Sequence, residues 1–128
     1  MTLPPKSNLL KRQGGRVPSI VQILPALVRG GVERGAVETA EAIQKHQGRA
    51  IVISRGGAMV RYLDRLGIKH YELDVHSKNP FRWPKLRRKL KEIFVNEEVD
   101  LVHVRARVPA WLAFPVTKSL GIPTVSTV

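Results

Sequence analysis

The chain has 128 residues, no cysteine, and 22 lysines and arginines against 10 aspartates and glutamates, a formal net charge of +12 at pH 7. Its length suits one domain, its 43% apolar content predicts a folded core, and the absence of cysteine excludes disulfides and cysteine-ligated zinc. No apolar run is long enough for a transmembrane helix. The charge excess favours anionic partners such as nucleic acid, acidic lipid or phosphorylated small molecules.

Residues 1–17 are basic, contain no acidic residue, and are interrupted by prolines and glycines, so we expect a disordered tail. Lys6, Lys11 and Arg12 break up any apolar run of the kind that a secretion signal needs. We therefore expect a cytoplasmic protein whose folded domain spans residues 18–128.

The first half of the folded part predicts two strand–helix units. An apolar run at 19–24 predicts a strand, and apolar residues at helical spacing over 32–45 predict a helix that Gly48 ends. A β-branched run at 50–53 predicts a second strand, and a short helix over 59–66 follows it.

The second half continues the alternation. Apolar residues at helical spacing predict helices over 83–94 and 108–120. Alternating residues predict a strand over 68–75, and apolar runs predict strands over 99–104 and 124–128. Pro115 would cost about 3 kcal/mol deep inside a helix, and we therefore expect the last helix to start as late as Ala113.

Strands that alternate with helices predict an α/β fold, an open parallel sheet with helices on both faces. We expect about five strands in the order 3-2-1-4-5. Val128 lies within an apolar β-run, so we expect a truncated chain, one half of something larger. A naturally small five-stranded domain is the alternative.

A glycine loop joins the first predicted strand to the first helix. A strand that turns through Gly30 and Gly31 into a helix start presents backbone N–H groups to an anion. Glycine leaves no Cβ in the way of a ligand. The loop therefore predicts a phosphate-bearing ligand near both glycines, and a plain tight turn is the alternative.

Polar and cationic residues follow several of the predicted strands. Because open α/β sheets bind ligands at the carboxyl ends of their strands, and arginine suits phosphate or carboxylate, we expect acceptor or anion binding there by Arg34, His76, Lys78, Asn79, Arg105 and Arg107. Solvated loop charge is the alternative. His103, within the fourth strand, is a candidate for catalysis, although a core or rim role is commoner for such a residue. No histidine–carboxylate spacing predicts a metal site.

The helix over 83–94 has a basic face flanked by aromatic residues. Such a pattern suits an acidic membrane surface, where each cation adds about 1 kcal/mol before screening. The candidate contacts are Phe81, Trp83, Lys85, Arg87, Arg88, Lys89 and Lys91. An ordinary amphipathic helix with a solvated exterior is the alternative.

Four segments in order resemble family 4 glycosyltransferases, enzymes of the GT-B fold in which two Rossmann-like domains face each other across a cleft. The segments are the glycine loop at 23–35, the stretch after the third strand at 75–80, the fourth strand and its loop at 100–107, and the lead into the fifth strand at 121–125. The resemblance implies that the chain is the Rossmann-like N-terminal, acceptor-side domain of a retaining enzyme.

The resemblance also implies a function. A sugar would pass from a nucleotide-sugar donor to a glycan or lipid-linked acceptor, as in lipopolysaccharide or cell-envelope glycan synthesis, with no metal or other cofactor. Gly30 and Gly31 would approach the donor phosphates. The donor-binding C-terminal domain would lie outside this chain, the isolated chain would be inactive, and the enzyme would sit at the inner face of the membrane.

Two other functions fit parts of the sequence. Ser54 and Arg55, after the second strand, would suit the 2′-phosphate of NADP in a reductase. However, Gly30, Gly31 and Gly35 do not form the G-x-G-x-x-G pattern of dinucleotide-binding loops. A basic nucleic-acid-binding module is the third possibility, but no recognition motif supports it and we expect no specific nucleic-acid partner.

Overall fold

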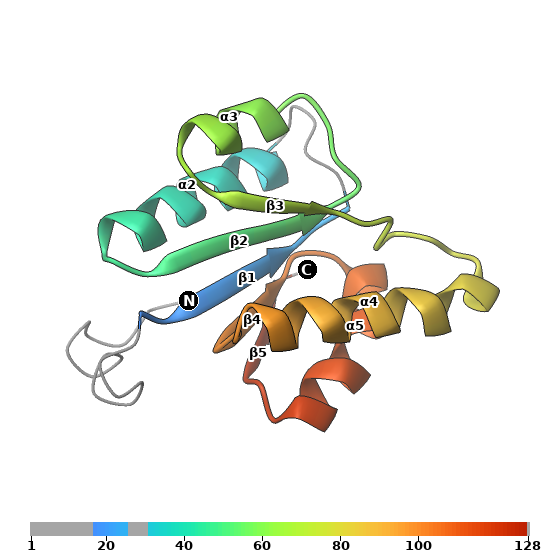
Figure 1. Ribbon diagram of the computed structural model, residues 1–128. Helices are drawn as coiled ribbons and strands as arrows, with labels where there is room; N and C mark the ends of the chain where they lie inside the picture. The colour runs from blue at the N-terminus through green and yellow to red at the C-terminus, as the bar shows by residue number, and fades with distance from the viewer. Residues whose placement is uncertain (1–16, 26–30, 128) are drawn as a thin grey trace.

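Five parallel strands form one sheet in the computed structural model of the chain, which describes residues 17–25 and 31–127 (Figure 1). The strands are β1 (Ser19–Ile23), β2 (Arg49–Ser54), β3 (Lys69–Glu72), β4 (Leu101–Val104) and β5 (Thr124–Ser126). The helical segments are α2 (Gly31–Lys45), α3 (Val60–Arg65), the 3-10 turn η1 (Pro80–Arg82), α4 (Trp83–Asn96) and α5 (Arg107–Leu120). The expected tail at 1–17 lies outside the described residues, apart from Val17.

The strand order is β3-β2-β1-β4-β5 with parallel pairing throughout, which confirms the predicted topology. In the central strand, Val21 pairs with Ile51 of β2 and with Val102 of β4. The chain extends the sheet from β1 to β3 on one side and then returns to the other side of β1. All five carboxyl ends consequently lie at one edge, where the loops that follow the strands gather.

Helices cover both faces of the sheet, with α2 and α3 on one face and α4 and α5 on the other (Figure 1). Alternate residues of each strand point to opposite faces. The α4–α5 side buries Val21, Ile51, Ile53, Val102 and Val104, and the α2–α3 side buries Ile20, Ala50 and Val52. Because each fully buried valine, leucine or isoleucine contributes about 1.5–3 kcal/mol, this two-sided core is the main driving force for folding.

Helix α5 starts well before Ala113, so the expected late start was wrong and Pro115 lies inside the helix. Proline has no N–H and leaves the carbonyl four residues earlier, that of Trp111, without its helical donor. Arg87 of α4 supplies a replacement, with its Nη2 3.0 Å from the Trp111 carbonyl oxygen and its Nε 3.2 Å from that of Leu112. A neighbouring helix therefore satisfies the backbone group that the proline exposes.

Strand β3 is shorter than the predicted 68–75. The N–H of Leu73 donates to the Ser54 carbonyl at 2.8 Å, and the N–H of Val75 then donates to the Leu73 carbonyl at 2.8 Å. Leu73 and Val75 remain buried in the core, whereas Asp74 between them keeps partial exposure. This turn carries the chain away from the sheet toward η1 and α4.

Candidate functional site

The segments that follow β1, β2 and β4 lie side by side at the carboxyl edge of the sheet. The N–H of Arg55 donates to the Pro25 carbonyl at 2.9 Å, and the N–H of Arg105 donates to the Ile23 carbonyl at 2.9 Å. Open parallel sheets bind ligands at this edge, where the strand order reverses. Here the reversal lies between β1 and β4, and the candidate site is built around the residues that follow them.

Arg105 lies at this reversal point, held between β1 and α2. Its Nε donates to Gln22 Oε1 at 2.8 Å and its Nη2 donates to Thr39 Oγ1 at 3.0 Å. The Gln22 amide is itself fixed, because its Nε2 donates to the Ala36 carbonyl at 2.9 Å. Both partners of Arg105 are neutral, and burial lowers the pKa of its guanidinium. The edge therefore presents a rigidly held positive charge that these partners do not neutralise.

The glycine loop lies only partly within the described residues. Gly30 falls outside them, and Gly31 is the first residue of α2. The strand, loop and helix follow one another as predicted, but contact of either glycine with a ligand stays a prediction. Arg34, in the first turns of α2, is exposed.

The remaining predicted anion-binding residues are exposed and separate. Arg107 starts α5, and His76 and Lys78 lie between β3 and η1. In the part of the chain that the structure describes, no hydrogen bond or ion pair joins these three side chains to Arg105 or to one another. Asn79 has a local role, because its Oδ1 accepts from the N–H of Phe81 at 3.1 Å and caps η1.

His103 lies in β4 with its side chain buried. Its Nε2 is 2.9 Å from Thr127 Oγ1. Burial, and next the nearby Arg105, lower its pKa to about 4. His103 is therefore neutral at pH 7 and poorly matched to general acid–base catalysis, which works best with a pKa near the operating pH. A catalytic role for His103 stays a prediction, and its surroundings favour a structural one.

A cationic hollow of about 370 Å³ opens at the carboxyl ends of β2 and β3, against α4. Its lining combines four basic, two acidic and two apolar residues: Arg55, Arg82, Lys85, Lys89, Glu72, Asp74, Leu73 and Leu86. Sequence analysis named Lys85 and Lys89 only as membrane contacts and Arg55 only for NADP. The signal available in the sequence was the spacing of Lys85 and Lys89, because residues four apart share a helix face.

The loop after β2 carries Arg55, which lines this hollow. Gly56 has φ +103°, and a Cβ built on it would lie 2.8 Å from Glu72 Oε1. The N–H of Gly56 also donates to Ser54 Oγ at 3.0 Å. Ser54 Oγ is in turn 2.7 Å from Nε2 of His70, a half-buried residue that the sequence did not single out. The positive φ therefore favours a glycine where the loop passes Glu72.

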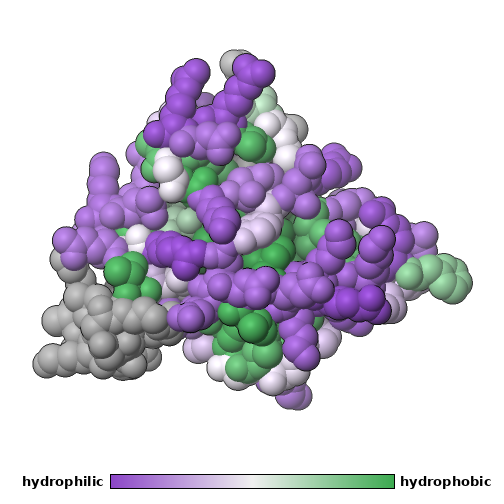
Figure 2. All heavy atoms as spheres, viewed as in Figure 1, coloured by the Kyte–Doolittle hydropathy of each residue, from purple (hydrophilic) through white to green (hydrophobic). Residues whose placement is uncertain are grey.

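The predicted membrane face divides into structural and exposed residues. Trp83 Nε1 donates to the Ser77 carbonyl at 2.8 Å, and the Arg87 guanidinium lies 5.4 Å from the Trp83 ring centre. Both residues therefore hold α4 in place. The exposed cations of α4 are Lys85, Arg88, Lys89 and Lys91, and Figure 2 shows the hydrophilic surface along this helix.

Aromatic residues are exposed on η1 and α5. Phe81 in η1 is 92% exposed, and Figure 2 shows an apolar group projecting at the end where η1 lies. Trp111 and Phe114 of α5 are 57% and 41% exposed, and sequence analysis missed both. Their spacing of three residues was a signal for a shared helix face.

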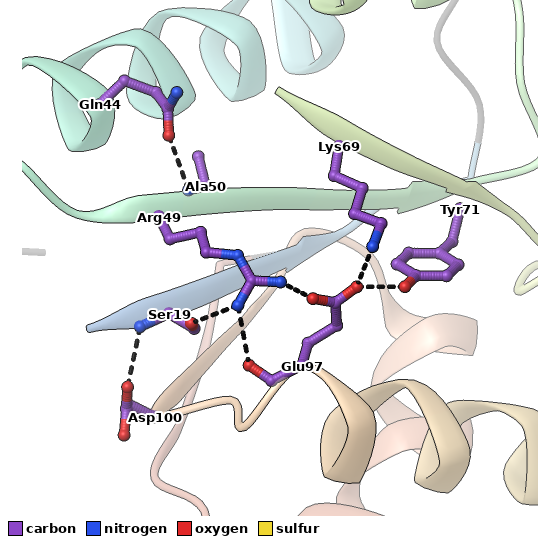
Figure 3. Close-up of polar contacts among 8 residues, drawn as sticks. All are labelled: Ser19, Gln44, Arg49, Ala50, Lys69, Tyr71, Glu97 and Asp100. Atoms are coloured by element: carbon purple, nitrogen blue, oxygen red, sulfur yellow. Dashed lines mark hydrogen bonds and ion pairs between the residues drawn. The ribbon is translucent and has the colours of Figure 1, made fainter. Parts of the chain in front are cut away.

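A second polar cluster lies at the opposite, amino edge of the sheet (Figure 3). The buried Glu97 carboxylate pairs with Arg49 and with Lys69, whose Nζ is 2.7 Å from Oε2, and it accepts a hydrogen bond from Tyr71. Arg49 also reaches the Glu97 carbonyl at 3.3 Å. The sequence did not predict this cluster. Since the buried carboxylate is paired with both cations, the cluster fixes the loop between α4 and β4.

Two searches of residues 17–25 and 31–127 were negative. No group of three or more histidine, aspartate or glutamate side chains there is placed to hold a metal ion. No helix there has the length and apolar character needed to cross a bilayer.

Residues 29–128 match the sequence profile described as Glycosyltransferase Family 4. A glycosyltransferase from Rickettsia africae is 39% identical, with a TM-score of 0.79 over 88% of this chain and 30% of that one. MurG from Acinetobacter baumannii is 19% identical, with a TM-score of 0.69 over 85% of this chain and 34% of that one, and it shows the fold alone. No curated protein sequence matches.

A putative UDP-N-acetylglucosamine 2-epimerase from Listeria monocytogenes also shares the fold, at 14% identity and a TM-score of 0.57 over 88% of this chain and 31% of that one. The chain thus spans about a third of the length of each of these proteins. The profile match favours the interpretation drawn from the four segments over the reductase and nucleic-acid alternatives.

Proposed function

Because this chain belongs to glycosyltransferase family 4, we propose that it is the N-terminal, acceptor-side domain of a retaining glycosyltransferase. The enzyme moves a sugar from a nucleotide-sugar donor to a glycan or lipid-linked acceptor of the cell envelope, such as lipopolysaccharide. It needs no metal or other cofactor. The donor-binding domain lies outside this chain, and the isolated chain is inactive.

The observation that carries this proposal is the position of Arg105. Sugar transfer breaks the bond between the sugar carbon and the donor phosphate oxygen, and the electron pair leaves with the nucleotide diphosphate. A positive charge fixed in advance beside that oxygen stabilises the charge that develops on it. We assign this role to Arg105, since two neutral side chains, Gln22 and Thr39, orient its guanidinium.

The start of α2 supports the same site. The first N–H groups of a helix have no intrahelical partner and favour an anion. Helix α2 begins at Gly31, after the loop that leaves β1, and Gly35 in the next turn lies next to Arg105, with 3.7 Å between a Cβ built there and Nη1. Donor phosphates at the start of α2 would lie close to Arg105.

A chimera tests the proposal. Residues 18–128 replace the segment that they match in the Rickettsia africae glycosyltransferase, and nucleotide release is measured over a panel of nucleotide sugars. We expect release by the chimera and none by the isolated chain. A folded chimera that releases no nucleotide, where the unmodified recipient does, would contradict the proposal.

Variants of the chimera distinguish a specific effect of Arg105 from the effect of removing any positive charge. Arg105→Met should lower kcat/KM for the donor about 10–100-fold, because a preorganised charge is lost at the leaving oxygen. Lys118→Ala removes an exposed cation in the last turn of α5 and should change kcat/KM less than about threefold. Equal effects of the two substitutions would remove Arg105 from the donor site.

We also propose peripheral contact with an acidic membrane, at the inner face of the cell membrane. Exposed Phe81, Trp111 and Phe114 supply aromatic groups of the kind that sit at headgroup level, and the exposed cations of α4 supply electrostatic attraction. Sedimentation with acidic and neutral vesicles tests this contact. Binding to both, or binding that does not weaken with salt, would contradict it.

A further inference from the structure

We propose that the cationic hollow between the carboxyl ends of β2 and β3 and helix α4 binds a phosphate or diphosphate group carried by the acceptor. This inference rests on the proposed function, since it names the class of acceptor that the domain takes. It makes the acceptor a phosphorylated molecule rather than a neutral glycan.

The first support is the convergence of cations from three separate elements on one hollow. Arg55 follows β2, Arg82 lies in η1, and Lys85 and Lys89 lie in α4. The two lysines are four residues apart, so they occupy the same face of the helix. The volume of about 370 Å³ leaves room for a diphosphate among these side chains.

The second support is the charge balance. Asp74 is paired with Arg82, whose Nη1 is 3.1 Å from its Oδ2. That pair leaves one carboxylate, Glu72, against Arg55, Lys85 and Lys89 in the lining. An anion with two negative charges would relieve this excess, and the planar guanidinium of Arg55 suits two phosphate oxygens at once.

The third support is the floor of the hollow. Leu73 and Leu86 are buried, with 8% and 4% of their surfaces exposed, and both belong to the core beneath α4. An apolar floor keeps water from one side of a bound anion, and the lower local dielectric strengthens its attraction to the cations.

The location assigns this group to the acceptor rather than to the donor. Arg105 and the start of α2 lie at the β1–β4 end of the sheet, on the α2 side. The hollow lies at the β2–β3 end, against α4. Phe81 is adjacent in sequence to Arg82 at the rim and is 92% exposed, so an apolar chain attached to the phosphate has a surface to lie on.

The test measures binding of inorganic pyrophosphate to the 128-residue chain by calorimetry at low salt. Lys85→Ala/Lys89→Ala removes two cations that line the hollow. The matched control Arg88→Ala/Lys91→Ala removes two exposed cations of the same helix that do not line it. Both double variants change the net charge equally, so any diffuse electrostatic effect is common to both.

We expect the dissociation constant to rise about tenfold or more in the Lys85/Lys89 variant, which loses two charge-assisted contacts, and less than about threefold in the control. Arg55→Gln, a single change outside α4, should raise it about threefold or more. Circular dichroism checks that each variant is folded. Equal losses in the two double variants, or no binding of pyrophosphate by the unsubstituted chain, would overturn the inference.

Two further probes identify the source of the phosphate. One is a soluble sugar 1-phosphate, and the other is a short prenyl diphosphate in zwitterionic vesicles. If the prenyl diphosphate binds more tightly than the sugar 1-phosphate, and Phe81→Ala abolishes that difference, the acceptor is lipid-linked. If the two probes bind equally tightly, the acceptor is soluble. Binding of neither probe would overturn the inference.

Failure here and failure of the proposed function give different results. In the chimera, release of nucleotide with water as acceptor depends on the donor site and should be unchanged by Lys85→Ala/Lys89→Ala. Nucleotide release without pyrophosphate binding would therefore overturn the hollow alone and leave the glycosyltransferase assignment intact.

Discussion

At the amino edge of the sheet, the buried Glu97 carboxylate is enclosed by Arg49, Lys69 and Tyr71 (Figure 3). At the carboxyl edge, Arg105 is held by neutral Gln22 and Thr39. Both edges bring charged groups together from distant parts of the chain. At the amino edge a carboxylate pairs with two cations, whereas at the carboxyl edge the positive charge of Arg105 is held by two neutral side chains.

This difference shows which edge stabilises the fold and which is available to a ligand. A buried charge without a partner is costly, so a protein that only needed to fold would pair it or replace it. Arg105 and the cationic hollow concentrate unneutralised positive charge at the edge where open parallel sheets bind ligands. The four predictions below test this contrast, in order of decreasing expected effect.

The largest effect is expected at the amino edge. Glu97→Ala leaves two cations and a tyrosine hydroxyl without their carboxylate. We expect a loss of about 2–3 kcal/mol in the free energy of unfolding, less than the 3–5 kcal/mol typical of a fully buried pair because the Arg49 and Lys69 side chains are 44% and 56% exposed. Urea denaturation measures it. Glu92→Ala, an exposed change in α4, is the control and should stay within about 0.5 kcal/mol.

Arg87 is a cation with a structural role, because it donates hydrogen bonds to backbone carbonyls of α5. Arg87→Ala removes the side-chain donor of the Trp111 carbonyl, a hydrogen bond at an exposed position, and should cost about 0.5–1.5 kcal/mol. Pro115→Ala restores the missing N–H, so it should stabilise the Arg87→Ala variant more than the unsubstituted chain, with a coupling of about 1 kcal/mol. A double-mutant cycle in urea measures this coupling, and simple additivity of the two changes would contradict it.

His103 makes stability depend on pH. Its folded-state pKa of about 4 lies below the unfolded value of about 6.5, so the unfolded chain binds the proton more readily. The contribution of His103 is therefore complete above pH 6.5 and is lost as the pH falls toward 4. His103→Gln should flatten the decline of the melting temperature between these values. Burial also lowers the pKa of His70, so the test is the difference between the two chains, and parallel curves would contradict it.

The fold could be predicted because its signals are local. Apolar, β-branched runs mark most of the strands and helical spacing marks the helices, and the parallel order follows from their alternation. The start of α5 was mispredicted because the donor that tolerates Pro115 comes from Arg87, on another helix. The cost of Pro115 was estimated from its own helix alone, and such an estimate takes no account of a hydrogen-bond donor on a neighbouring helix.

The site could be predicted only in part. Arg105 was named from its place after the fourth strand, but its partners Gln22 and Thr39 are 83 and 66 residues away in sequence. The hollow joins Arg55 to Lys85 and Lys89, which lie beyond β3 in the chain. Residue type and strand order therefore locate the edge that binds a ligand. The tertiary contacts decide which cations there are left unneutralised.

The smallest expected effect on stability is at Arg105, although the same substitution should have a large effect on activity. Arg105→Met removes two hydrogen bonds, which are worth about 0.5–1.5 kcal/mol each. It also removes a partly buried charge whose partners are neutral. The desolvation cost of that charge is then no longer incurred, which offsets most of the free energy lost with the two hydrogen bonds. We expect the free energy of unfolding of the isolated chain to change by less than about 1 kcal/mol. Urea denaturation beside Glu97→Ala gives the comparison.

A loss at Arg105 as large as that at Glu97 would mean that both edges serve the fold, and the contrast between them would fail. Thr39→Val is a matched control, since it removes one acceptor of Arg105 and leaves the charge in place. If the charge itself is what the carboxyl edge requires, Thr39→Val in the chimera should retain most of the activity for the donor, whereas Arg105→Met should lose it. Stability that is preserved together with activity that is lost would place Arg105 in the ligand site rather than in the core.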